Sequence, residues 1–381
     1  MRRIDPGDLR RLPPSRILLV GPPPLHTVLE GPPPELALPV WLLLSDLQLL
    51  ATRNVEQGGG PVVRGSALAH GSPADAELRE PLRLLDAAVR EGRTVGTEVG
   101  VTVALGRIVA VFRERGWEMA AMTVAESWLW VQPESSAANL VAGSLAGDAG
   151  RLGEAETLSA RSLIIARQAE DWAAYCEAGL ALGEAHRRRG ASAAARRILT
   201  KVQKRGRRQG LKDAAAAAAH GLFTLAAEAG DLEVGRARAE EALHEYPPGH
   251  ERRALLTRQL AQLSTERGDH RGALRLLSGI GEAAGAPVER ALRAASACRA
   301  AALVEDRERF EWFWASAWRW SYDESARAAW TPCLMELARA AHAMGDGERA
   351  RMAAARAVEP AREGGDEESV LALRDLLDPV R

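Results

Sequence analysis

The chain has 381 residues, enough for two or three globular domains or for one repeat array. Its 50 Lys and Arg residues balance 51 Asp and Glu residues, so the overall charge argues against a nucleic-acid-binding protein. The three cysteines, Cys176, Cys298 and Cys333, lie too far apart in sequence for a disulfide framework or a paired-cysteine metal motif. We therefore expect a protein of the reducing cytoplasm.

Residues 1–71 form a Pro- and Gly-rich segment that differs from the rest of the chain. Its proline runs limit helices, because proline lacks a backbone N–H and clashes with the preceding turn. Short strands are predicted at 16–20 and 62–63, and a buried apolar helix at 41–53. Two interpretations stay open: a cap over the end of the following array, or an independent functional module.

The most apolar run, residues 36–51, includes Ser45, Asp46 and Gln48. A helix that spans a bilayer needs about 20 predominantly apolar residues. The run is shorter and more polar than that, so we expect no membrane association.

Residues 72–100 predict a lead-in helix. Ser72 before Pro73 is typical of a helix start, with Ser as the N-cap and Pro at the first helical position. The helix is expected to run to about Arg90 and to stop at Gly92.

Residues 101–381 repeat one pattern: a helical apolar pattern, a turn with Gly, a second helical pattern and a polar break. The two clearest copies are 40 residues apart, with Leu182, His186, Gly190, Ala195 and Leu199 in one and Leu222, Ala226, Gly230, Gly235 and Ala239 in the other. Because one helix pair cannot bury both of its faces, the copies must stack on one another.

The turn glycines indicate the number of copies. They stand at positions 116, 150, 190, 230, 268 and 345, with spacings of 34, 40, 40, 38 and 77 residues. The last spacing holds two units, and Glu305-Asp306 takes the place of a Gly-Asp turn between them. The sequence thus predicts an all-α array of about seven helix-turn-helix units, closed by a capping helix at 367–377.

These units resemble the tetratricopeptide repeat (TPR) family, in the lengthened form of bacterial regulatory and sensor proteins. The resemblance is carried by Leu182-Gly183, Gly190 and Ala195, and by Gly230, Ala242 and Pro247. The period of mostly 38–40 residues exceeds the family's usual length of about 34. The resemblance implies an α-solenoid superhelix whose first helices line a concave groove that binds a peptide or a segment of another protein.

The first helices carry the candidate residues of this groove, which are Glu177, Glu184, Arg187, His220, Arg258, Gln262, Arg299 and Arg339. Three of the arginines, Arg258, Arg299 and Arg339, come from successive units. A guanidinium presents a fork of donors that suits a carboxylate, so they predict a clamp for an acidic peptide or a free C-terminus. The alternative is solvated charge that pairs with Glu residues of the same chain.

A basic patch lies within residues 185–212, which include no acidic residue. Arg197, Lys201, Lys204 and Arg208 fall near one stripe of a helix. The patch fits an acidic protein surface better than nucleic acid, because no aromatic residues for base stacking are interleaved with it. A solvated convex face is the alternative.

Half of the ten tryptophans lie within residues 310–330. Phe310 and Trp314 fall on the apolar face of a helix, whereas Trp312, Trp318 and Trp320 are candidate partner-binding residues, because Trp is favoured as an interface anchor. The alternative is packing within the chain.

The sequence has no phosphate-binding Gly-x-x-x-x-Gly-Lys-Ser/Thr loop, no His-Glu-x-x-His motif, and no His and Cys residues at metal-ligand spacing. We therefore predict a non-catalytic adaptor or regulatory protein that uses no cofactor or metal and binds another protein or a peptide segment. Two other functions stay open: the ligand-sensing part of a bacterial transcription regulator, and an accessory subunit of an enzyme complex.

Overall fold

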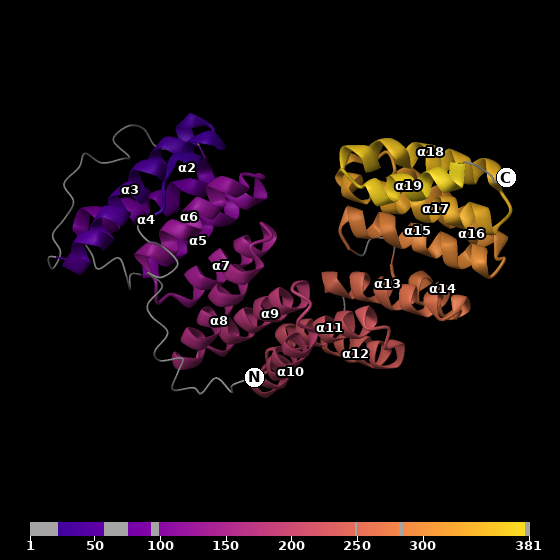
Figure 1. Cartoon of the computed structure of the whole chain (residues 1–381), viewed down its shortest axis with the longest axis horizontal. Coiled ribbons are helices and arrows are strands. Elements are labelled where there is room, and N and C mark those ends of the chain that lie inside the picture. Colours follow the sequence, from indigo (N-terminus) through magenta and orange to yellow (C-terminus); the bar gives the residue numbers. More distant parts are fainter. Residues whose placement is uncertain (1–21, 57–74, 93–98, 248–249, 282–284, 378–381) are drawn as a thin grey trace. The chain divides into compact units, whose positions relative to one another are not determined.

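The computed structural model describes residues 22–56, 75–92, 99–247, 250–281 and 285–377, and the regular structure in these ranges is helical (Figure 1). The strands predicted at 16–20 and 62–63 and the helix start predicted at Ser72-Pro73 lie outside the described residues. The chain divides into two compact units, residues 1–214 (unit 1) and 215–381 (unit 2). The division falls inside one helix, α11 (Lys212–Glu228).

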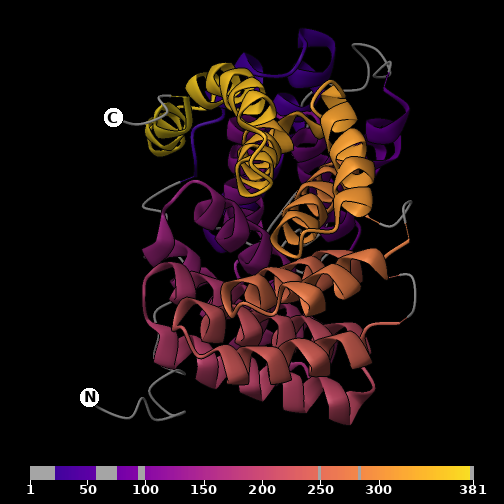
Figure 2. The same ribbon diagram turned by 90° about the vertical axis from the view of Figure 1, so that its right-hand side faces the viewer.

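Seven helix pairs follow one another along the chain, and the helices of a pair lie side by side in both views (Figures 1 and 2). They are α5 (Val99–Glu114) with α6 (Glu118–Val131), α7 (Ser136–Asp148) with α8 (Leu152–Gln168), α9 (Trp172–Arg188) with α10 (Ser192–Gln209), α11 with α12 (Leu232–Glu245), α13 (Glu251–Glu266) with α14 (His270–Ser278), α15 (Pro287–Leu303) with α16 (Arg307–Trp320), and α17 (Trp330–Ala343) with α18 (Gly347–Glu363). The C-terminal helix is α19 (Glu367–Leu377), at the predicted residues. A 3₁₀ helix that the sequence did not predict, η3 (Glu324–Ala329), joins α16 to α17. Both units are therefore α-solenoids of TPR-like helix pairs, which confirms the predicted fold class.

The turns inside the pairs share one construction. All six predicted turn glycines have a positive φ, between 71° and 80°. Glycine adopts this left-handed conformation without the steric cost that a Cβ adds. In several pairs an Asp follows the glycine and caps the second helix: the side chains of Asp231, Asp269 and Asp346 each accept a hydrogen bond from a backbone N–H three residues later.

Glu305 occupies the glycine position of the sixth pair and has a φ of +60°. A residue with a Cβ is destabilised in this conformation by about 1–2 kcal/mol. We expect Glu305→Gly to raise the free energy of unfolding by about 0.5–1 kcal/mol, because this relief exceeds the entropy that glycine adds to the unfolded chain. Urea denaturation measures the change.

The matched control for that variant is Gly268→Ala, at the same position of the preceding pair. A Cβ at Gly268 would meet no atom within 4 Å, so its cost comes from the backbone alone. We expect a loss of about 1 kcal/mol there. If Glu305→Gly also lowered stability, the account of these turns would be wrong.

Unit 1 begins with α2 (His26–Glu30), α3 (Pro34–Glu56) and α4 (Ala76–Glu91). α4 is capped by Asp75, whose side chain accepts a hydrogen bond from the backbone N–H of Glu77 at 2.8 Å. It ends at Gly92, as predicted, in a left-handed conformation. The lead-in helix thus begins three residues after the predicted Pro73.

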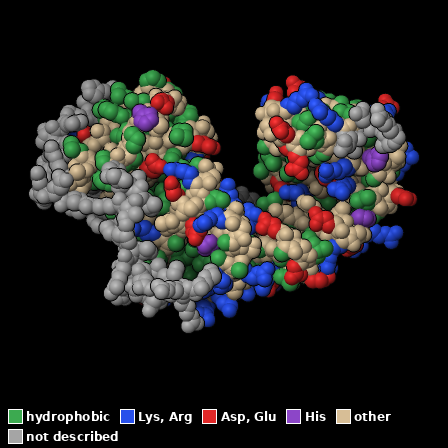
Figure 3. Space-filling model, in the orientation of Figure 1, with side chains coloured by type: hydrophobic (Ala, Val, Ile, Leu, Met, Phe, Trp, Pro, Cys, Tyr) green, Lys and Arg blue, Asp and Glu red, His purple; other side chains and the backbone are tan. Residues whose placement is uncertain are grey.

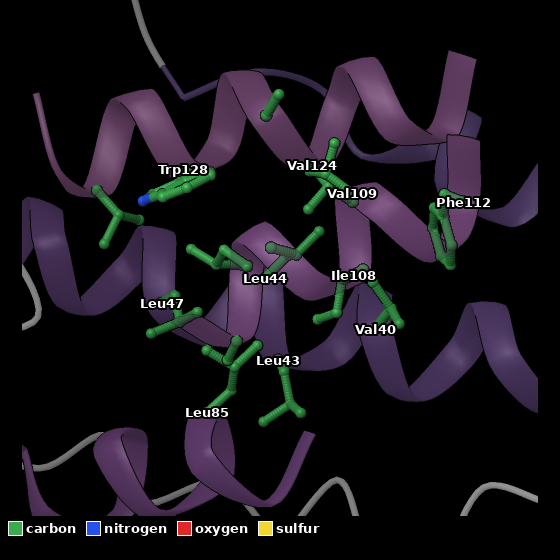
Figure 4. Close-up of a cluster of buried hydrophobic side chains, with 14 of the residues drawn as sticks. Val40, Leu43, Leu44, Leu47, Leu85, Ile108, Val109, Phe112, Val124 and Trp128 are labelled. Atoms are coloured by element: carbon green, nitrogen blue, oxygen red, sulfur yellow. The ribbon is translucent and has the colours of Figure 1, made fainter. Parts of the chain in front are cut away.

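The core of unit 1 joins these helices to the first repeat pair. Figure 4 shows Leu43 and Leu47 of α3 with Leu85 of α4, Ile108 of α5 and Trp128 of α6 in one buried cluster. The side-chain amide of Gln48 also donates hydrogen bonds to Ser127 Oγ at 3.0 Å and to the Pro23 carbonyl at 3.1 Å. The described part of the N-terminal segment therefore packs onto α6, as a cap does.

By length and composition, α3 is the one described helix that could span a membrane, over Pro34–Thr52. In the structure 56% of this stretch is buried inside the fold. Asp46 and Gln48, two of the polar residues of the stretch, are buried as well. α3 is thus packed as a core helix of unit 1.

The three cysteines are free thiols, and all three are buried. Burial raises the pKa of Cys333 to about 12 and also raises the pKa of Cys176 and Cys298. The thiols are therefore neutral at physiological pH and shielded from solvent. They serve as small apolar core residues.

Candidate functional site

The first helices of three successive pairs, α13, α15 and α17, line a cavity of about 470 Å³ within unit 2. We call it the unit 2 groove. Its lining combines apolar side chains with a polar set, which is Arg258, Gln262, Thr265, Glu266, Ser296, Arg299, Glu336 and Arg339. The apolar part includes Leu277, Leu292 and Met335. Four predicted groove residues, Arg258, Gln262, Arg299 and Arg339, thus meet around one cavity.

Arg258 is the most enclosed of the three predicted clamp arginines. Its Nε donates a hydrogen bond to Glu289 Oε1 at 2.8 Å. Only 14% of the Arg258 side chain and 12% of the Glu289 side chain are exposed. Because a nearly buried guanidinium needs a carboxylate partner, this ion pair is part of the framework of the groove.

Arg299 and Arg339 lie on the open side of the groove and share one carboxylate. Nη1 of Arg299 donates to both oxygens of Glu336 at 3.1 Å, and Nη1 of Arg339 donates to Glu336 Oε1 at 3.0 Å. Their side chains are 37% and 44% exposed. Each guanidinium has five N–H donors, so the single shared carboxylate leaves unused donors and a net charge of about +1 on this group of three side chains, while Glu266 adds a negative charge to the same lining.

Pairing with Glu residues of the same chain, the alternative raised by the sequence, is therefore present at all three arginines. Sequence reasoning missed the two partners, Glu289 and Glu336. Glu336 stands three residues before Arg339, a spacing typical of helix surface pairs, and this signal could have identified it. Glu289 is 31 residues from Arg258, and only the stacking of the pairs brings the two together.

Three of the predicted groove residues, Glu177, Glu184 and Arg187, lie on α9 of unit 1 and not in the unit 2 groove. Glu184 and Arg187 pair with each other on α9 of unit 1 at 2.6 Å, and the Arg187 hydrogen bonds hold the pKa of Glu184 below its ordinary value. Glu177 is exposed on the same helix. Gln262, within the unit 2 groove, is 3.4 Å from Glu266 Oε1.

His220, on α11, is half-buried and its Nε2 is hydrogen-bonded to Gln259 Oε1 at 2.6 Å. Burial lowers the pKa of His220, and the Arg252 charge lowers it further, against the opposing effect of the Gln259 hydrogen bond. The folded protein therefore binds a proton at His220 less readily than the unfolded chain. Its contribution to stability is present above the unfolded pKa of about 6.5, and it is lost as the pH falls from there through the lower pKa of the folded protein.

We expect His220→Gln to reduce the drop in melting temperature between about pH 7.5 and pH 5, because the variant removes this titration. Thermal unfolding followed by circular dichroism at both pH values measures it. The control is His342→Gln, which makes the same substitution at an exposed histidine of α17 and keeps the half-buried imidazole of His220. An unchanged drop in His220→Gln would contradict the prediction.

The predicted aromatic residues occupy three different environments on α16. Trp312 is 52% exposed. Trp318 is half-buried and stacks on Trp314, with ring centroids 5.8 Å apart and an interplanar angle of 10°. Trp320 packs against the core of unit 2. Packing within the chain thus engages Trp318 and Trp320, and Trp312 is the solvent-facing member of the three.

The predicted basic patch is a continuous exposed stripe on α10 of unit 1. Arg197, Lys201, Lys204 and Arg208 are all exposed. Figure 3 shows basic side chains on the surface over α10.

Among the described residues, no three His, Cys, Asp or Glu side chains lie together in a way that could hold a metal ion. The unit 2 groove offers guanidinium donors beside apolar side chains.

No protein-family model matches the chain, and no curated protein sequence matches it significantly. Solved structures do match. The apo form of RapI matches with a TM-score of 0.51 at 11% identity, over 69% of this chain and 98% of RapI. PilF of Pseudomonas aeruginosa matches with a TM-score of 0.45 at 12% identity, over 60% of this chain and 95% of PilF.

A third solved structure, a Rap protein complexed with competence and sporulation factor, matches with a TM-score of 0.45 at 11% identity, over 89% of this chain and 84% of that protein. At these identities the likeness to RapI concerns the fold. It agrees with the TPR-like helix pairs seen in both units.

Proposed function

We propose that this chain is a non-catalytic adaptor or regulatory protein whose unit 2 groove binds a segment of another protein. The observation that carries the proposal is the pair of half-exposed guanidiniums, Arg299 and Arg339, that share Glu336 beside an apolar lining. A groove built from packed helices is preformed, so binding has a small ordering cost on its side.

The volume of the groove limits what enters it. About 470 Å³ corresponds to a small-ligand pocket, so one or two residues of a partner segment fit inside. The segment we propose carries a carboxylate, from Asp, Glu or a free C-terminus, next to an apolar side chain. The carboxylate would accept hydrogen bonds from Arg299 and Arg339, and the apolar side chain would contact Leu292 and Met335.

We also propose a cytoplasmic location. The three cysteines are free and buried, and no pair of them is joined. Free thiols of this kind are ordinary in a reducing compartment. The free thiols support the location proposed from the sequence, and this argument is independent of the groove.

The test is a selection of random peptides with free C-termini against the whole protein, followed by fluorescence anisotropy with the selected peptides. We expect peptides that combine a carboxylate with an adjacent apolar residue. Arg299→Ala/Arg339→Ala should weaken their binding by about tenfold or more, because each charge-assisted hydrogen bond contributes about 1.5–3 kcal/mol.

The matched control is Arg307→Ala/Arg319→Ala, which removes two exposed arginines of α16 and the same net charge. It should bind the selected peptides as the wild type does. Equal weakening in both double variants would mean that peptide binding depends on the overall charge of the protein and not on the groove. Full binding in Arg299→Ala/Arg339→Ala would exclude this groove as the peptide site.

A further inference from the structure

α10 carries four exposed basic side chains along one of its faces. Elsewhere, several arginines pair with acids about one repeat away: Arg113 with Asp148, Arg189 with Glu156, and Arg349 with Glu311. The stripe of α10 (Arg197, Lys201, Lys204 and Arg208) forms no such ion pair within the described part of the chain. Exposed arginines of other helices, such as Arg307 and Arg351, also form no ion pair within the described residues, but the stripe places four unpaired basic side chains along one face of a single helix.

The stripe lies directly opposite the core face of α10. The buried residues of this helix include Ala195, Leu199, Val202 and Gly206. With about 100° between successive residues, the four basic side chains are centred about 180° from them. They point straight away from the core, and the eleven residue steps from Arg197 to Arg208 extend over about 16 Å.

Like charges three and four residues apart repel one another along this face. The helix itself supplies no relief, because its sequence from Ser192 to Gln209 contains no acidic residue. All three lysines of the chain, Lys201, Lys204 and Lys212, stand on α10 or just beyond it. A partner that brings carboxylates to the stripe would relieve this repulsion as it binds.

The surroundings of the stripe favour an acidic protein over nucleic acid. The nearby aromatic ring of Trp172 is covered by the Arg205 guanidinium, 3.8 Å from the ring centroid, so it is not presented for base stacking. The phosphate backbone of a nucleic-acid duplex winds around the duplex axis, so it follows a straight stripe over only a short length. The carboxylates of another helix, by contrast, recur at the same three- and four-residue spacing as the stripe.

We propose that the stripe of α10 docks an acidic amphipathic helix of a partner protein, with carboxylates at positions i, i+4, i+7 and i+11 facing the four basic side chains. This surface belongs to unit 1 and its argument is independent of the unit 2 groove. Since the charges are exposed to solvent, the affinity of this contact should fall as the ionic strength rises, because salt screens the charges.

The test uses a labelled helical peptide with Glu at those four positions, and a peptide of the same composition with the Glu residues spread around the helix. Fluorescence anisotropy with the whole protein measures both. The wild type should bind the first peptide about tenfold more tightly than the second, since four exposed ion pairs add together. A labelled DNA duplex is the third probe and should bind more weakly than the first peptide.

The charge-reversed variant is Arg197→Glu/Lys201→Glu/Lys204→Glu/Arg208→Glu. Its control is Arg307→Glu/Arg319→Glu/Arg351→Glu/Arg362→Glu, which changes the net charge equally at exposed positions of unit 2. Loss of peptide binding in the first variant alone supports the proposal. Equal loss in both, equal affinity for the two peptides, or tighter binding of the duplex would each overturn it.

Discussion

Trp314→Ala is expected to lower the free energy of unfolding by about 3–5 kcal/mol, because removal of a buried Trp leaves a large cavity. Only 7% of Trp314 is exposed. Its ring stacks on Trp318 and lies against Phe310, with centroids 5.8 Å and 5.7 Å away. The Arg349 guanidinium from α18 lies 5.4 Å from the same ring, so the residue also joins two neighbouring pairs.

The comparison for this prediction is Trp312→Ala, two residues away on the same helix. Trp312 is 52% exposed, so we expect a change within about 0.5 kcal/mol. Urea denaturation followed by circular dichroism measures both variants. Similar losses of stability in the two variants would contradict the structure, which buries Trp314 and exposes Trp312.

Arg258→Ala is expected to cost about 2–4 kcal/mol, because it leaves the nearly buried carboxylate of Glu289 without its partner. The double variant Arg258→Met/Glu289→Leu should recover most of this loss, since apolar side chains of similar size can replace a buried ion pair. Denaturant unfolding of the wild type and both variants measures the difference.

This pair of variants separates a framework arginine from the two ligand-facing ones. A loss below about 0.5 kcal/mol in Arg258→Ala would mean that Arg258 behaves as a surface residue and is free to bind a partner. Failure of the double variant to recover stability would instead indicate that the charges themselves hold α13 against α15.

The helix pairs could be predicted from sequence because their signals are local. A glycine in the left-handed conformation and an Asp cap depend on only a few neighbouring residues, as at Gly268 and Asp269. The repeat period then places each next helix. The division of the chain within α11 has no such local signal, because it depends on how tightly neighbouring pairs pack.

The candidate site was predictable only in part, for a physical reason. Helical periodicity placed Arg258, Arg299 and Arg339 on the first helices of three successive pairs, and the structure brings them to one cavity. Which carboxylate each arginine meets depends on side-chain direction and on distances between repeats, as with Glu289 and Arg258. Periodicity within one helix does not contain that information.

The aromatic residues show the same limit. Spacing along α16 predicted a core role for Phe310 and Trp314, and both are buried. The contacts of Trp318 with the neighbouring pair arise from α18, whose Arg356 lies 6.0 Å from its ring. Such a contact between neighbouring helix pairs follows from their stacking and is not encoded in the spacing of one helix.

The affinity of Glu336→Gln for a peptide selected on the wild type tests the central claim most directly. If Glu336 holds the place of a partner carboxylate between Arg299 and Arg339, the neutral side chain should compete less and leave more positive charge in the groove. We therefore expect binding to tighten by about three- to tenfold, opposite in sign to Arg299→Ala/Arg339→Ala. Unchanged or weaker binding in Glu336→Gln would contradict recognition of a carboxylate in this groove.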